Sequence, residues 1–322
     1  MSVQFPPSNP AGHGIVYLSS SPPQFRTITY SYPLKLISPA PLSYGSRLVH
    51  TLFLLTYGGG LVAGDKVNLS VTLEPQTHLI LLTQGSTKIF KTPDPSILSS
   101  QWMAINLGSA SALCYIPDPV QPFRDSAFEQ TQLFYLDAPD ASLCVCDWVS
   151  GGRVARGENW NFWRYGSRNE VWDVERDGKR RLLLRDNLLL DSQKACNIGF
   201  MANRVDHLGV FGTVILRGPV FSQLASFFIN EFEALPRIGE KRWDDAEESK
   251  PNANSTEGRR KLREKQDERD GLLWTAARVR DFVLVKFAAR EVQGAKRWLK
   301  AMLQEDGSLE ESFGERSTLC LK

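Results

Sequence analysis

The stretch that decides the fold is LLTYGGGLVAGDKVNLSVTLEPQTHLILLTQGSTKIFK, residues 54–91. Gly58, Gly59 and Gly60 predict a turn, because glycine takes positive φ at little steric cost. In residues 66–73 apolar and polar side chains alternate, which is the period of a half-buried strand. Residues 77–83 are more uniformly apolar and predict a fully buried partner strand. The stretch therefore predicts a strand–turn–strand unit that anchors the fold.

The glycine-rich turn does not fit the common nucleotide-binding motifs. A phosphate-binding P-loop needs Lys and then Ser or Thr after its second glycine, but Asp65 follows Gly64. A dinucleotide-binding motif must open a helix, whereas residues 66–73 have the pattern of a strand. We therefore interpret Asp65 as a turn residue whose carboxylate accepts nearby backbone N–H groups.

The composition predicts a cytoplasmic globular protein of one large or two ordinary domains. The chain has 322 residues, 42% hydrophobic and 23% charged, which is enough for a sizeable core. Its net charge of +2 gives no indication of nucleic-acid or membrane binding. No apolar run is long enough to span a bilayer, and the first residues lack the pattern of a signal peptide. Five scattered cysteines indicate reduced thiols.

Strand-like segments follow one another without intervening helices, which favours a mainly β body. Besides the opening unit, these are residues 14–20, 25–32, 47–56, 101–107, 112–116, 128–136, 143–149, 160–165, 207–217 and 272–287. Residues 170–176 and 179–185 flank Asp177-Gly178, a strong hairpin signal.

Two helices are predicted in the C-terminal third, over residues 220–235 and 291–303, because apolar residues recur there every three or four positions. Both are candidate partner surfaces. In the first, Phe227 and Ile229 widen the apolar face, which indicates either full burial or an exposed patch for a partner helix.

Residues 240–270 contain nine Lys or Arg and ten Asp or Glu with almost no large apolar side chains. Such a segment buries too little surface to offset its chain entropy, so we predict a disordered insertion. Its RRKLREK run, residues 259–265, is either a nucleic-acid patch or a solvated face, and the acidic neighbours favour the second.

The sequence predicts no tight metal site. None of the four histidines lies at metal-binding spacing from another. Cys144 and Cys146 share one face of a predicted strand, where they are either soft-metal ligands or, as we favour, small buried side chains.

Two polar clusters lie on loops. Arg153, Arg156 and Glu158 follow a predicted strand, as either an ion pair that braces a turn or a polar site at the end of a sheet. Asp118 lies among three prolines that stiffen the chain, as either a turn residue or a presented carboxylate.

Four motifs together resemble the UreD family of urease accessory proteins, called UreH in some bacteria. They are GGGLVAGD (58–65), TQGSTKIF (83–90), LCYIPDP (113–119) and GGRVARGE (151–158). The resemblance runs from about Pro33 to the last predicted helix, and the charged insertion indicates a eukaryotic, fungal member. Two departures are Tyr57, where the family usually has proline, and Cys114-Tyr115, where a Glu-Trp pair is common.

The resemblance implies a single β-solenoid-like domain over residues 33–322 with two C-terminal helices, preceded by a leader and first strands over residues 1–32. It implies a non-enzymatic urease maturation factor that binds apo-urease, a UreF-like protein and a UreG-like GTPase. Nickel would pass through transiently, with Asp65 and Glu158 as the leading carboxylates, Asp118 as a further candidate, and Lys88 and Arg153 as their structural partners. The residues that carry the family motifs are Gly58, Gly59, Gly60, Gly64, Thr83, Gln84, Gly85, Thr87, Lys88, Arg153 and Gly157.

A second hypothesis is an enzyme. A carbohydrate hydrolase or lyase on a β-solenoid would use Asp65, Asp118 and Glu158 as its acid and base groups.

Overall fold

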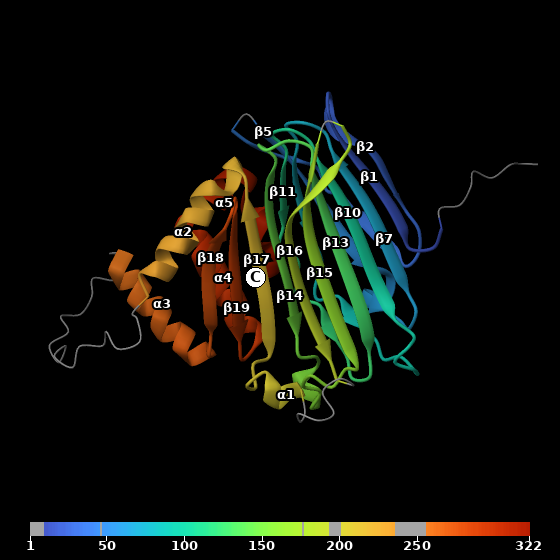
Figure 1. Ribbon diagram of the computed structural model, residues 1–322, viewed down its shortest axis with the longest axis vertical. Helices are drawn as coiled ribbons and strands as arrows, with labels where there is room; N and C mark the ends of the chain where they lie inside the picture. Colours follow the sequence, from blue (N-terminus) through green and yellow to red (C-terminus); the bar gives the residue numbers. More distant parts are fainter. Residues whose placement is uncertain (1–9, 46, 176, 193–200, 236–255) are drawn as a thin grey trace, which may run out of the picture.

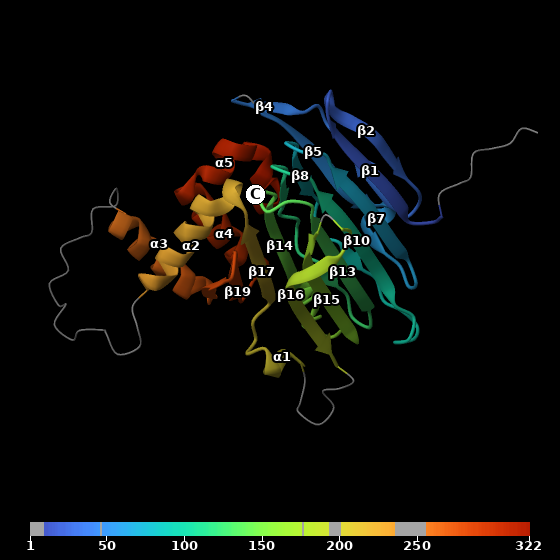
Figure 2. The ribbon, with the colours of Figure 1, turned by 45° about the horizontal axis from the view of Figure 1, so that its top comes forward.

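Two large β-sheets pack face to face, and a layer of helices covers the outer face of one of them (Figures 1 and 2). The computed structural model describes residues 10–45, 47–175, 177–192, 201–235 and 256–322. The order of layers is therefore sheet, sheet, helices.

The strands form two large sheets and one small one. The seven-stranded sheet contains β1 (His13–Ser20), β2 (Pro23–Tyr30), β7 (Lys66–Leu73), β10 (Ser99–Leu107), β13 (Ala127–Leu136), β15 (Arg164–Val174) and β16 (Arg180–Asp191). The nine-stranded sheet contains β3 (Leu34–Ile37), β4 (Leu42–Tyr44), β5 (Arg47–Thr56), β8 (His78–Leu82), β11 (Ala112–Tyr115), β14 (Ser142–Ser150), β17 (Val210–Arg217), β18 (Leu273–Val279) and β19 (Phe282–Ala289). The small sheet contains β6 (Gly60–Leu61), β9 (Lys88–Ile89) and β12 (Gln121–Pro122).

The described part of the chain contains five α-helices, and all of them except α1 lie in the C-terminal third. They are α1 (Met201–Arg204), α2 (Ser222–Glu233), α3 (Thr256–Asp270), α4 (Val292–Asp306) and α5 (Ser308–Phe313), with 3-10 turns at Tyr57–Gly59, Val154–Arg156, Pro219–Phe221 and Glu315–Leu321. The two predicted helices correspond to α2 and α4, so the expectation of only two was too low. None of the described helices combines the length and the apolar composition needed to cross a membrane.

The chain alternates between the two large sheets from β5 to β15. β5, β8, β11 and β14 pair in parallel in one sheet, and β7, β10, β13 and β15 pair in parallel in the other. Antiparallel strands extend both sheets: β2 and β16 at the edges of the first, and β17, β19 and β18 beyond β14 in the second.

The mainly β prediction is correct, but the expectation of a β-solenoid is wrong. The observed sheets are broad mixed layers, widened by antiparallel strands that belong to no repeating coil. The small sheet between the two layers consists of β6, β9 and β12, each only two residues long. A period-2 pattern shows that a strand is half-buried, but it does not show how its sheet continues sideways.

Residues 272–287 are also corrected, because they form two antiparallel strands rather than one. Arg280 has a φ of 54° and turns the chain between β18 and β19. The hairpin predicted at Asp177-Gly178 is confirmed, with β15 and β16 antiparallel on either side.

The first apolar core fills the space between the two large sheets. It takes alternate residues from each strand, such as Leu69 and Val71 of β7 and Leu79 and Leu81 of β8, all essentially inaccessible to solvent. The alternation in residues 66–73 therefore has the predicted cause, since one face of β7 is buried against the facing sheet.

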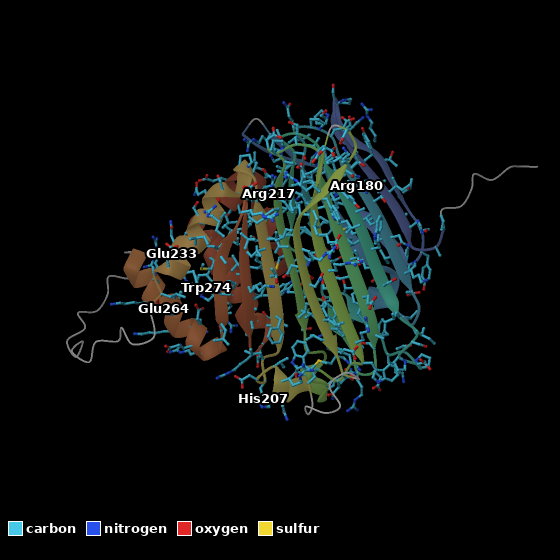
Figure 3. All side chains as sticks on the ribbon, in the orientation of Figure 1. Arg180, His207, Arg217, Glu233, Glu264 and Trp274 are labelled. Carbon is cyan, nitrogen blue, oxygen red and sulfur yellow. The ribbon has the colours of Figure 1, made fainter. Side chains whose placement is uncertain are left out.

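The second apolar core lies between the nine-stranded sheet and the helices. Trp274 extends from β18 into this layer (Figure 3), with its ring centroid 5.4 Å from those of Phe232 and Trp298. Phe227 and Ile229 of α2 are partly buried against this core, which favours burial over an exposed apolar patch.

Cys144 and Cys146 point into the second core together with Cys114. All three are buried free thiols, and burial raises the pKa of Cys146 well above its ordinary value. Thiolates are the form that binds soft metals, so the geometry supports the interpretation as small buried side chains.

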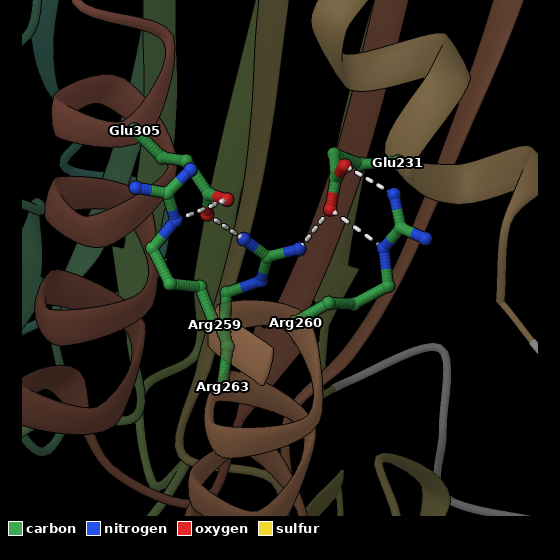
Figure 4. Close-up of polar contacts among 5 residues, drawn as sticks. All are labelled: Glu231, Arg259, Arg260, Arg263 and Glu305. Carbon is green, nitrogen blue, oxygen red and sulfur yellow. Dashed lines mark hydrogen bonds and ion pairs between the residues drawn. The ribbon is translucent and has the colours of Figure 1, made fainter. Parts of the chain in front are cut away.

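Helix α3 corrects part of the predicted disorder. Residues 256–270 are helical, while residues 240–255 lie outside the described residues. Figure 4 shows why a helix with so few apolar side chains is held: Arg263 pairs with both Glu231 of α2 and Glu305 of α4. Arg260 adds a 2.6 Å contact to Glu231, and Arg259 lies 3.7 Å from Glu305.

This ionic cluster is largely buried, with side-chain exposures of 8% for Arg263 and 5% for Glu231. Burial alone would raise the pKa of Glu231, but hydrogen bonds from Arg260 and Arg263 lower it below its ordinary value. The three arginines of the RRKLREK run thus have intramolecular partners, which argues against a nucleic-acid patch.

Asp267 of α3 makes the stability of this helix depend on pH. Burial raises its pKa to about 7, with Arg263 opposing and Asp270 and Glu264 adding to the shift. The folded state therefore favours the protonated form of Asp267. The resulting contribution to the free energy of unfolding is fully present below the unfolded pKa of 3.8 and is lost as the pH rises through 7. We expect Asp267→Asn to stabilise the protein by about 1 kcal/mol at pH 8 and negligibly at pH 4. Urea unfolding at both pH values measures this, and equal midpoints at pH 8 would contradict it.

Candidate functional site

The four motifs meet at one corner, where the chain crosses between the two sheets. Lys88 of β9 pairs with Gly60 of β6 on one side and with Gln121 of β12 on the other. The fourth motif lies next, since the Gln121 side-chain amide donates a 3.3 Å hydrogen bond to the Gly152 carbonyl. Motifs that are far apart in sequence are therefore neighbours in the structure.

The three consecutive glycines have two different roles at this corner. Gly58 and Gly59 have φ values of 76° and 74°, in the left-handed region that disfavours a side chain. Gly60 is extended, but a Cβ there would lie 2.4 Å from the Lys88 carbonyl oxygen. The first two glycines permit the turn, and the third permits the close approach of β9.

Asp118 joins the second motif, the third motif and helix α4. Its backbone N–H donates to Thr83 Oγ1 at 2.8 Å, and its Oδ2 accepts from the Gly85 N–H at 3.0 Å. Lys296 of α4 lies 2.6 Å from Oδ1, and both side chains are about nine-tenths buried. Cys320 completes the contact by donating to the Thr83 carbonyl at 3.3 Å. Asp118 is thus a buried, paired carboxylate.

Glu158 braces the fourth motif. Arg153 makes a bidentate ion pair with it, and the Arg124 N–H donates to Oε2 at 3.3 Å. The Arg153 bond holds the pKa of Glu158 below its ordinary value. The Arg153 guanidinium also lies 3.9 Å from the centroid of the Phe123 ring. These contacts support the interpretation of the cluster as an ion pair that braces a turn.

Asp65 caps its own turn, as predicted. Its Oδ2 accepts the Val62 N–H at 3.0 Å, next to Gly64 with a φ of 81°. The remaining motif residues support the corner through their backbone: the Thr87 carbonyl accepts the Gln121 N–H at 2.9 Å, and the Gly157 N–H closes the turn onto Val154. Gln84 and Lys88 are exposed.

A second polar feature, which sequence reasoning missed, lies between the sheets. We call it the interior polar row. It consists of Gln101, Gln130, Gln132, Ser167 and Asn169 from the seven-stranded sheet and Asp147 from the facing sheet. Strand register aligns it, because Gln101, Gln130 and Ser167 are consecutive neighbours across β10, β13 and β15, and Gln132 pairs with Asn169 in the next position.

Asp147 is the charged centre of this row. The amide groups of Gln130 and Asn169 each donate to its carboxylate at 2.6 Å, and the Ser167 hydroxyl donates as well. Burial raises the pKa of Asp147 above its ordinary value, against the effect of Ser167, Asn169 and Gln130. A half-buried carboxylate held this way beside an apolar core is costly, which argues for a functional role.

Two acceptor oxygens beside Asp147 are unsatisfied. Gln132 Oε1 and Asn169 Oδ1 are buried and have no hydrogen-bond partner among the described residues. Buried polar atoms are almost always paired, so these oxygens are available to a water molecule or a cation.

The interior polar row connects the corner formed by the four motifs to the surface. A cavity of about 10 Å³, close to the space of one water molecule, borders Thr83, Asp118, Gln101, Gln130 and Asp147. A groove of about 340 Å³ also borders Asp147 and opens at the edge of the sheets, where Asp186 and Lys286 line it. Asp118 and Asp147 therefore lie along one polar line, whereas Asp65 and Glu158 belong to turns at the corner.

The signal that could have found the row is polar residues at core-facing positions. Phe128, Gln130, Gln132 and Phe134 are alternate residues of β13 and all buried. Two glutamines inside an apolar series are a departure from the period-2 pattern, but one strand alone does not show what they face.

A cavity of about 790 Å³ lies at the other end of β8. His50 and His78 line it, and burial lowers the pKa of both, that of His78 to about 4. His50 packs against Phe25 and His78 against Phe313, on opposite faces of the nine-stranded sheet. Within the described ranges no three His, Cys, Asp or Glu side chains gather to hold a metal.

Comparison with known proteins agrees with the four stacked motifs. Residues 19–319 match the family described as UreD urease accessory protein. The chain belongs to the UreD family. Urease accessory protein 4 of Cryptococcus neoformans is 34% identical over 94% of this chain and 92% of its own length. A UreD-like protein of Schizosaccharomyces pombe is 29% identical over 86% and 87%, and UreD of an Anaeromyxobacter strain is 30% identical over 85% and 77%.

UreD proteins are named as accessory factors of urease, so this chain is an accessory protein with a role in urease maturation rather than an enzyme. The geometry gives no support to the hydrolase hypothesis. Asp65 caps a turn, Asp118 is paired with Lys296 and Glu158 with Arg153, so each carboxylate already has a structural partner.

Proposed function

We propose that this UreD protein carries Ni²⁺ along the interior polar row on its way to apo-urease. The observation that carries the proposal is a line of oxygen donors through an otherwise apolar interior, with two of those oxygens unsatisfied. Apolar packing costs less free energy than such a row, so the presence of the row favours a functional role.

The donor set suits an ion that must be released. Carboxylate, carbonyl and water oxygens bind divalent nickel more weakly than a histidine or thiolate cage does. Asp147 supplies the only negative charge in the row, and the amide oxygens of Gln132 and Asn169 supply neutral ligands beside it. Metal would move through transiently, without a tightly bound cofactor.

The proposal includes the partners implied by family membership: apo-urease, a UreF-like protein and a UreG-like GTPase. Asp118 connects the inner end of the row to helix α4 through Lys296. A partner that binds the helical layer would therefore contact an element joined to the row.

A gene deletion tests this function. We expect urease from the deletion strain to be inactive and nickel-poor, and the wild-type chain to restore both and to co-purify with the UreF-like protein. Urease purified from each strain is measured for activity and for nickel per active site. Normal nickel content in the deletion strain would exclude the proposal.

A further inference from the structure

The interior polar row continues to the edge of the molecule through strand register. In the nine-stranded sheet, Asp147, Thr213 and Lys286 are consecutive neighbours across β14, β17 and β19. In the facing sheet, Asn169 pairs with Asp186 of β16, the edge strand. Two polar lines that face each other thus run from Asp147 outward to Asp186 and Lys286.

Lys286 lies at the mouth of this path. Its ammonium is 2.6 Å from Asp186 Oδ1 and donates a 3.2 Å hydrogen bond to Thr213 Oγ1. The same groove is lined by Asp147, so the ammonium lies on the outward path from the central carboxylate. The Lys286 side chain is 52% exposed and Asp186 is 14% exposed, so the pair can exchange with solvent.

Asp147 and Asp186 act on each other electrostatically. Burial is the main cause of the raised pKa of Asp147, and the negative charge of Asp186 adds to it. The mouth therefore has two carboxylates and one tethered cation, and the buried Asn169 Oδ1, beside Asp147, has no partner among the described residues. Such a site has the charge to accept a divalent cation once the ammonium leaves.

We propose that Lys286 is a tethered cation that occupies the mouth of the interior polar row, and that a divalent metal ion takes its place beside Asp186 and Asp147. This inference rests on the proposed function and adds the position where the ion enters or leaves. Lys286 is a gating residue in this scheme, because its charge repels a metal ion until it separates from Asp186.

The path contains a second lysine–aspartate pair, Lys296–Asp118. Its burial and hydrogen bonding indicate which of the two pairs lies where the ion enters or leaves. Lys296 and Asp118 have side-chain exposures of 12% and 9%, and the Gly85 N–H also holds Asp118. A pair buried and hydrogen-bonded in this way braces the corner. Of these two pairs, only Lys286–Asp186 borders a groove large enough for a hydrated ion.

The test is nickel binding by the purified full chain, with NiCl₂ alone as the probe. Equilibrium dialysis at low ionic strength and neutral pH compares wild type with Lys286→Met, which removes the charge but keeps much of the side-chain length. We expect Lys286→Met to lower the apparent Kd for Ni²⁺ at least about tenfold, because a cation next to the site is gone. The charge-preserving Lys286→Arg is expected to bind like wild type.

Two further variants locate the effect. Lys179→Met removes a lysine from another exposed lysine–aspartate pair, with Asp177 at 2.8 Å, away from the groove, and should leave the Kd unchanged. Adding Asp147→Asn to Lys286→Met should abolish the gain. Thermal melting confirms that each variant is folded.

Unchanged or undetectable binding by Lys286→Met, or an equal gain in Lys179→Met, would overturn the gating role. That result is separable from failure of the proposed function. Full urease activation by Asp147→Asn would exclude the proposed nickel route. Loss of activation by Asp147→Asn together with an unchanged nickel affinity of Lys286→Met would exclude only the gating role of Lys286.

Discussion

Replacing Asp147 with asparagine is expected to reduce urease activation at least about tenfold in cells that lack the wild-type chain. The substitution keeps the size of the side chain and removes the only charge in the interior polar row. A divalent cation in an apolar interior depends on that charge, because neutral amide oxygens alone do not offset its lost hydration. The protein itself should stay folded, since burial disfavours the carboxylate and the change relieves that cost.

The measurement is urease activity and nickel per active site after complementation with each variant. Asp173→Asn is the matched control, because Asp173 pairs with the exposed Arg181 at 2.9 Å and lies outside the row. Melting temperatures of both variants exclude loss of fold as the cause. Full activation by Asp147→Asn would show that nickel does not depend on this carboxylate.

Replacing Arg263 with methionine is expected to destabilise the protein by about 3 kcal/mol. The change leaves Glu231 and Glu305 without their shared partner in a largely buried position. Glu231 keeps its contact with Arg260, which places the effect at the lower end of the range for a broken buried ion pair. Detachment of α3 should accompany the loss, because the only large apolar side chain of that helix, Leu262, is 55% exposed.

Urea unfolding followed by circular dichroism measures this effect, with Lys265→Met as the control on the exposed face of α3. The control should change the unfolding free energy by no more than about 0.5 kcal/mol. If the Arg263→Met midpoint matched that of the control, ion pairs would not be what holds α3 in place.

Local patterns predicted the strands well and the layers poorly. The alternation in residues 66–73 and the Asp177-Gly178 turn correspond to β7 and to the β15–β16 hairpin. These features depend on residues that are neighbours in sequence, so a local pattern predicts them. Pairings between strands far apart in sequence, such as β17 on β14, also widen the sheets, and no local pattern specifies them.

The candidate site was predicted in part. The motifs identified Asp118, which does border the polar line, but they also singled out Asp65 and Glu158, which brace turns. Asp147 was missed because its importance comes from Gln130 and Asn169 on two strands of the opposite sheet. Helix α3 was missed for a similar reason, since the carboxylates that hold it belong to helices on either side of it in the chain.

The contacts of Asp118 and Thr83 have a consequence for biosynthesis. Lys296 follows Asp118 by 178 positions, and Cys320 follows Thr83 by 237. Because the ribosome synthesises the chain from the N-terminus, the strands at the corner are complete long before Lys296 and Cys320, which contact them, have been added. In a nascent chain Asp118 would thus lack its Lys296 partner, and the corner would be completed only after α4 has been synthesised.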